Sequence, residues 1–226
     1  MNRYTPLLLL LAACCSSTAV VAQDAAREAM VAEAVTAAIR RDAEQGNAIA
    51  QNVLAEMYDR GEGVPKNHGE AVKWYRLAAD QGITSAQYNL GLMYALGEGV
   101  AENDAEAVKW FRLAAKQGNA SAQYNLGVMY AKGEGVAEND AEAVKWYRLA
   151  AAQGNASAQS NLGVMYHRGE GVPESKVDAY FWWNLAAAQG LADAKTNKGI
   201  VEKEMTREQI DEAQRRSAAW KPKTKG

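Results

Sequence analysis

Residues 82–117 read GITSAQYNLGLMYALGEGVAENDAEAVKWFRLAAKQ, and residues 118–153 repeat this segment with 30 of 36 positions unchanged. Glycines mark the same phase along the chain, since Gly46, Gly82, Gly118, Gly154 and Gly190 follow one another at intervals of 36 residues. A period in this range is typical of repeat architectures, in which each unit packs only against its neighbours. The sequence therefore predicts four units, over residues 46–81, 82–117, 118–153 and 154–189.

Each unit carries two apolar stripes with helical spacing. The first predicts a helix over about residues 84–96, and the second predicts a helix over about residues 104–116. The stripes consist of Ala86, Leu90, Met93 and Tyr94, and then of Val108, Trp110, Phe111, Ala114 and Ala115. Below, the first helix of a unit is called its A helix and the second its B helix. The chain is thus predicted to be all-α.

The ends of these helices have their own residue signals. Asn103 stands at the expected N-cap of the B helix, with Glu106 placed to reach back to the backbone of the cap. Gly97 and Gly99 suit the left-handed conformation that closes an A helix. Gly91, Gly127 and Gly163 lie within A helices, where glycine costs about 1 kcal/mol relative to alanine. We expect these three glycines to admit the rings of Trp110, Trp146 and Trp182, respectively.

The pattern from Ala86 through Leu90-Gly91, Met93-Tyr94 and Gly97-x-Gly99-Val100 to the Trp110-Phe111-Arg112 segment resembles the Sel-one-like repeat family, a relative of the tetratricopeptide repeats. The resemblance covers residues 46–189. It implies a right-handed α-solenoid in which the A helices line a concave face. It also implies a protein-binding groove, because tetratricopeptide grooves bind extended peptides through A-helix positions of this kind.

The two ends of the chain depart from the repeat. Residues 1–22 resemble a bacterial secretory signal, with a leucine run at 7–11 and small residues before Gln23. Leu11-Ala12-Ala13-Cys14 also resembles a lipobox, so a signal ending at residue 13 with lipidation of Cys14 is the alternative. Residues 23–45 are expected to form an N-terminal capping helix. Residues 190–226 are expected to form a degenerate half-repeat, a capping helix started by Thr206 and Gln209, and a basic, solvated tail.

Composition and motifs exclude several classes of function. The formal charge of −2 and the interspersed charges disfavour nucleic acid, and no later apolar run is long enough to span a membrane. His68, expected in a turn, and His167, in the fourth A helix, are too far apart in the array to share a metal. The repeated serines, such as Ser85, lack a nucleophile elbow, and the acids before the B helices are explained by capping. We therefore expect no catalytic residue, no metal and no cofactor.

A ladder of polar and apolar side chains remains for binding. If the apolar A-helix positions face the core, the neighbouring positions point to the concave face. The expected partner-binding residues are Tyr88, Asn89, Leu92, Tyr124, Asn125, Val128, Lys132, Ser160, Asn161 and Arg168. Asparagine amides both donate and accept hydrogen bonds, and tyrosine supplies contact area at low entropic cost.

Two functions of different classes remain. The leading hypothesis is a non-catalytic scaffold of the bacterial cell envelope, periplasmic or secreted, that binds a peptide or protein in the concave groove. The alternative is a protein that binds or hydrolyses cell-wall compounds or β-lactams, as is implied by cysteine-rich members of the same family. This chain lacks the repeated cysteine pairs of those members, since Cys14 and Cys15 are its only cysteines.

Overall fold

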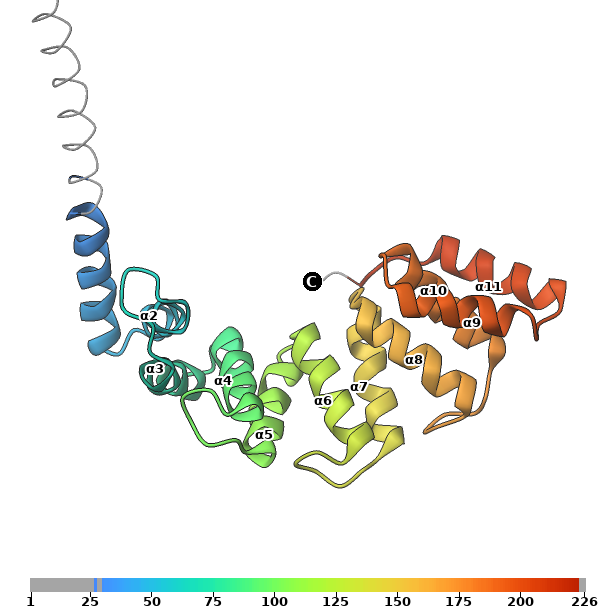
Figure 1. Cartoon of the computed structure of the whole chain (residues 1–226), viewed down its shortest axis with the longest axis horizontal. Coiled ribbons are helices and arrows are strands. Elements are labelled where there is room, and N and C mark those ends of the chain that lie inside the picture. The colour runs from blue at the N-terminus through green and yellow to red at the C-terminus, as the bar shows by residue number, and fades with distance from the viewer. Residues whose placement is uncertain (1–26, 28–29, 224–226) are drawn as a thin grey trace, which may run out of the picture.

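The computed structural model of the chain describes residue 27 and residues 30–223, and the regular elements within these residues are all helices. Figure 1 shows the helices stacked in successive pairs along an open, curved array. Helical residues 30–44 precede this array.

The A helices are α2 (Ala48–Arg60), α4 (Thr84–Leu96), α6 (Ala120–Lys132) and α8 (Ala156–Arg168). The B helices are α3 (His68–Asp80), α5 (Asp104–Lys116), α7 (Asp140–Ala152) and α9 (Lys176–Ala188). Helices α10 (Ala192–Glu202) and α11 (Arg207–Ala219) complete the chain, and α11 packs on α9.

The helix ends follow the predicted chemistry in most respects. Asn103 caps α5 by accepting a hydrogen bond from the amide of Glu106, and Gly97 closes α4 with a φ of 67°. The side chain of Glu106 does not complete a capping box, because it pairs with Lys109 one turn further along the helix. Thr206 and Gln209 do form the reciprocal capping box at the start of α11. His68 is the first residue of α3 rather than part of the preceding turn.

The mid-helix glycines admit a different ring from the one predicted. A Cβ added to Gly91 would lie 2.7 Å from the ring of Phe111, and Gly127 and Gly163 stand in the same relation to Tyr147 and Trp183. The prediction that the rings of Trp110, Trp146 and Trp182 fill this space is therefore wrong by one residue. One residue turns a helix by about 100°, which is enough to exchange the ring at the helix contact for its neighbour. The tryptophans at the predicted positions pack against the core, Trp110 fully and the others in part.

A ladder of buried glutamines, which the sequence analysis missed, joins consecutive units. Each side-chain amide donates to a carbonyl near the end of the preceding helix at 3.0–3.2 Å. Each side-chain oxygen accepts from the glutamine that ends its own unit at 2.7–2.8 Å. The buried members are Gln51, Gln87, Gln123 and Gln159, and their partners are Gln81, Gln117, Gln153 and Gln189. Because a buried amide is costly to leave unpaired, this ladder fixes the register between units.

The C-terminal end of the array is covered by α11, which packs on α9. Phe181 and Trp183 are buried, and the guanidinium group of Arg216 on α11 lies 4.8 Å from the ring centre of Phe181. On α11, Ala213 and Ser217 face the core, whereas Ala218 is exposed. The tail is not wholly solvated, because the amide of Lys223 donates to the carbonyl of Ala152 at 2.8 Å. The predicted leader, including Cys14, lies outside the described residues.

Candidate functional site

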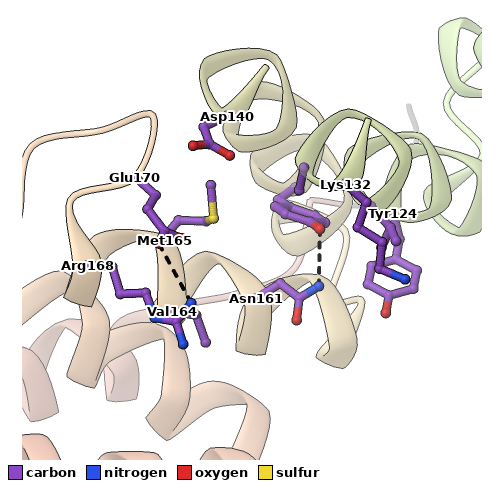
Figure 2. A pocket seen from close by; sticks show the side chains of 11 residues that line it. Tyr124, Lys132, Asp140, Asn161, Val164, Met165, Arg168 and Glu170 are labelled. Atoms are coloured by element: carbon purple, nitrogen blue, oxygen red, sulfur yellow. Dashed lines mark hydrogen bonds and ion pairs between the residues drawn. The ribbon is translucent and has the colours of Figure 1, made fainter. Parts of the chain in front are cut away.

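A hollow of about 370 Å³ lies between the A helices α6 and α8, where the sequence predicted binding residues. Figure 2 shows Tyr124 and Lys132 on one side of this hollow, and Asn161, Val164 and Arg168 on the other. Val128, Ala131 and Met165 add apolar surface, and Tyr147 of the B helix α7 reaches in between the two A helices. Five of the ten predicted residues therefore line one cavity: Tyr124, Val128, Lys132, Asn161 and Arg168.

A second hollow repeats this arrangement one unit earlier. It measures about 200 Å³ and lies between α4 and α6, where Leu92, Asn125 and Val128 line it. Val128 lines both hollows, so they follow one another along the A helices. The side chain of Leu96, which also lines the second hollow, is 63% exposed. We call the surface formed by the two hollows the A-helix face.

Three predicted residues line neither hollow. Tyr88 packs its ring 5.9 Å from that of Phe111, and Asn89 hydrogen-bonds the hydroxyl of Tyr75. Ser160 is only 8% exposed, and its carbonyl accepts a hydrogen bond from the indole nitrogen of Trp183 at 3.0 Å. The small serine stands where the second and third units have Tyr88 and Tyr124, beside the largest ring at the glycine contact. Ser160 is thus a packing residue, and its predicted place on the open groove is wrong.

The rim of the larger hollow carries charges of both signs. Lys132 lies 3.4 Å from Glu134, and Arg168 lies 3.7 Å from Glu170. Such exposed pairs contribute little to stability, so separating one of them costs little free energy. Asn161 donates to the hydroxyl of Tyr147 at 3.2 Å, and an asparagine amide has further donor and acceptor positions. An apolar floor, an amide and exposed rim charges are features that suit a peptide ligand.

Asp140 and Glu170 also line this hollow, and the sequence analysis did not place them there. Asp140 begins α7, where the acids were explained by helix capping and the helix dipole. Glu170 belongs to the turn after α8, which packs over the start of α7, since a Cβ on the neighbouring Gly171 would overlap the carbonyl group of Asp140. Only the stacking of one unit on the next brings these acids to the rim. The recurrence of the acid in every Gly-Glu-Gly-Val turn was the available signal.

Titration of Tyr147 makes the stability of this region sensitive to alkaline pH. Burial, chiefly, raises the pKa of Tyr147 to about 12, although the hydrogen bond from Asn161 opposes the shift. A tyrosine in the unfolded chain loses its proton near pH 10. The contribution of buried Tyr147 to stability is therefore complete below pH 10 and disappears as the pH rises through about 12. We expect the free energy of unfolding to fall by about 3 kcal/mol over this range from Tyr147 alone.

Urea unfolding followed by circular dichroism at pH 9 to 12 checks this expectation. Tyr147→Phe is the matched variant, because it keeps the ring against Gly127 and removes the ionisable hydroxyl. Its stability should decline less steeply with pH than that of the wild type. The decline will not vanish, because burial also raises the pKa of Tyr75. Identical slopes for the two proteins would contradict the assignment.

These elements form an all-α repeat solenoid whose A helices carry two consecutive hollows on one face. Comparison with known proteins agrees: Sel1 repeats match at residues 48–83, 84–119, 120–155 and 156–191. The chain belongs to the Sel1 repeat family. The Sel1 repeat fold is in general a non-catalytic scaffold for protein–protein interaction.

Two solved structures show what the chain is similar to. One is c5321, a protective antigen present in uropathogenic Escherichia coli strains, with 39% sequence identity and a TM-score of 0.73. That match covers 80% of this chain but only 39% of the antigen. The other is a Sel1 repeat protein from Oxalobacter formigenes, with 36% identity, a TM-score of 0.68 and coverage of 78% of this chain and 75% of that one. None of the curated proteins compared matches the chain. Within the described residues, no helix is long and apolar enough to cross a membrane.

Proposed function

We propose that this chain is a non-catalytic interaction scaffold of the bacterial cell envelope, which holds a peptide or a protein loop along its A-helix face. The observation that carries the proposal is the cavity between α6 and α8, lined by two consecutive A helices. Its smaller counterpart between α4 and α6 presents a second position one repeat away. A ligand in extended conformation can place successive side chains in such repeated hollows.

The residues of the larger hollow can make different kinds of contact with a ligand. Val128, Val164 and Met165 offer apolar surface for a ligand side chain, and the amide of Asn161 is placed to bond the ligand backbone. Lys132 and Arg168 reach over the rim and can exchange Glu134 and Glu170 for acidic groups of the ligand. No step in this mechanism requires a nucleophile or a cofactor.

Placement in the envelope rests on the leader-like residues 1–22. Cleavage after Ala22 gives a periplasmic or secreted protein. Lipidation of Cys14 gives a protein held at a membrane by its anchor. Mass spectrometry of the mature N-terminus distinguishes the two routes.

Charge reversal on the rim tests the binding proposal without disturbing the core. The side chains of Lys132 and Arg168 are exposed, so the variant K132E/R168E should fold as the wild type does. We expect it to lose at least one protein that the wild type captures from envelope fractions after mild crosslinking. The structure favours this variant over alanine at Tyr88, because Tyr88 packs on Phe111 and its removal would also affect folding.

The matched control is K109E/K145E. Lys109 and Lys145 are equally exposed and also pair with glutamates, but they lie on the B helices α5 and α7. This variant should capture the same proteins as the wild type, which separates the effect of the site from that of net charge. If K132E/R168E and the control both capture the complete wild-type set, the A-helix face is not the binding surface.

A further inference from the structure

Three side chains of metal-ligating type meet where the first unit joins the second. Asp59 lies near the end of α2, His68 begins α3, and Glu98 belongs to the turn that follows α4. One ligand atom from each of the three lies within 4.8 Å of the others. His68 Nδ1 is 3.2 Å from a carboxylate oxygen of Asp59 and 3.7 Å from one of Glu98. The cluster therefore spans two units and both helices of the first.

We propose that Asp59, His68 and Glu98 form a binding site for a divalent transition-metal ion, Zn²⁺ or one of similar chemistry, which links the first two units. Zinc binds nitrogen and oxygen ligands at about 2.0–2.2 Å, which places neighbouring ligands of a tetrahedron about 3.4 Å apart. The two distances from His68 Nδ1 lie close to this value. Three protein ligands leave the fourth position for water or for an additional ligand.

The nitrogen of His68 supports the proposal independently of these distances. His68 Nδ1 is shielded from solvent, and within the described residues it has no hydrogen-bond partner of acceptable geometry. Buried polar atoms are rarely left unpaired. A metal ion bound by all three side chains would accept the lone pair of His68 Nδ1. Neither carboxylate oxygen would then need to lie in the direction that a hydrogen bond to this nitrogen requires.

The backbone around the cluster is held in place. A Cβ on Gly99 would overlap the carbonyl group of His68, so the turn that carries Glu98 packs directly on the start of α3. This contact limits relative movement of the two units at the site. A preorganised pair of ligands loses less entropy on binding an ion than two mobile ones.

The site is particular to this junction. The later units keep the glutamate as Glu134 and Glu170, but they have Asp104 and Asp140 at the histidine position. They also have Ala95 and Ala131 in place of Asp59. The first junction is thus the one that has both the imidazole of His68 and the carboxylate of Asp59 in addition to the recurring glutamate. An imidazole among the ligands favours zinc and other transition metals over Ca²⁺ and Mg²⁺, which bind oxygen ligands.

Calorimetric titration with ZnCl₂ and with CaCl₂ tests the proposal on the full chain, purified without a histidine tag and stripped with chelator. Cys14 and Cys15 are replaced by serine in all proteins compared, because thiolates also bind zinc. We expect one Zn²⁺ ion per chain, much weaker Ca²⁺ binding, and a melting temperature that rises with Zn²⁺ concentration.

The variant His68→Gln should weaken Zn²⁺ binding by more than the roughly 10–100-fold that is typical for loss of an outer-shell partner. His167→Gln removes the chain's only other histidine and should bind as the reference protein does. Asp59→Asn gives a second readout if His68→Gln unfolds. Equal Zn²⁺ binding by the reference, His68→Gln and Asp59→Asn proteins, equal affinity for Ca²⁺ and Zn²⁺, or absence of Zn²⁺ binding would each overturn the proposal.

Discussion

Substitution of Gly135 by alanine is expected to be among the most destabilising methyl additions in the turns, together with the equivalent changes at Gly99 and Gly171. Gly135 has a φ of 66°, and a Cβ there would overlap the carbonyl carbon and oxygen of Asp104 on the preceding unit. The left-handed conformation alone costs about 1–2 kcal/mol for a residue with a Cβ. The clash is with backbone, which no side-chain rotation relieves, and overpacking of this kind adds about 1–3 kcal/mol.

The first unit supplies a matched control for this prediction. Gly63 occupies the same position, with a φ of 71°. A Cβ there would meet only the side-chain ends of Thr36 and Met57, at 2.8 Å and 3.1 Å. Gly63→Ala should therefore show the conformational cost with little of the clash. Urea unfolding of both variants measures the difference, and equal losses of stability would show that the packing of turn on helix is not tight.

Replacement of Gln123 by methionine is expected to have the second largest effect. Methionine has nearly the same volume, so the change removes hydrogen bonds without opening a cavity. Gln123 is 4% exposed, donates to the carbonyl of Ala115 and accepts from Gln153, so it joins α5, α6 and the end of α7. The substitution removes two hydrogen bonds that contribute about 0.5–1.5 kcal/mol each, while the carbonyl of Ala115 keeps its bond from the amide of Gly118, so the expected loss is about 1–3 kcal/mol.

Gln153→Met is the companion variant. It removes the same bond between the two glutamines but leaves the bond from Gln123 to Ala115 in place. Gln153 is also partly exposed, so water can replace what is lost. Its unfolding free energy should fall by about 1 kcal/mol. A similar loss of unfolding free energy for both variants would mean that the bond from Gln123 to the Ala115 carbonyl contributes little to holding the units in register.

Local signals in the sequence were sufficient for the helices but not for their contacts. The apolar spacing and the caps at Asn103 and Gly97 predicted residues 84–96 and 104–116, which are the bounds of α4 and α5. Which ring meets Gly91 depends on how far one helix is rotated against another, and this rotation is set by tertiary packing. The prediction chose Trp110, whereas the structure places Phe111 there.

The residues of the candidate site likewise fall into those that one helix determines and those that contacts between elements determine. The periodicity of a single helix was sufficient to group Val128 and Lys132, which line the same hollow. Ser160 was assigned with them because it shares their repeat position, yet the larger ring of Trp183 covers it. Asp140 and the Asp59–His68–Glu98 cluster depend on contacts between units, which a period cannot reveal.

Site-specific photo-crosslinking tests most directly the claim that the partner lies on the A-helix face. A photoreactive amino acid is placed at Val128 or Val164 in the hollows, and at Leu113 or Leu149 on exposed parts of the B helices. The four proteins are irradiated in living cells, and the crosslinked products are identified by mass spectrometry. We expect one shared partner to be crosslinked from Val128 and Val164 and to be absent from Leu113 and Leu149. A partner crosslinked only from the two leucines would contradict this claim.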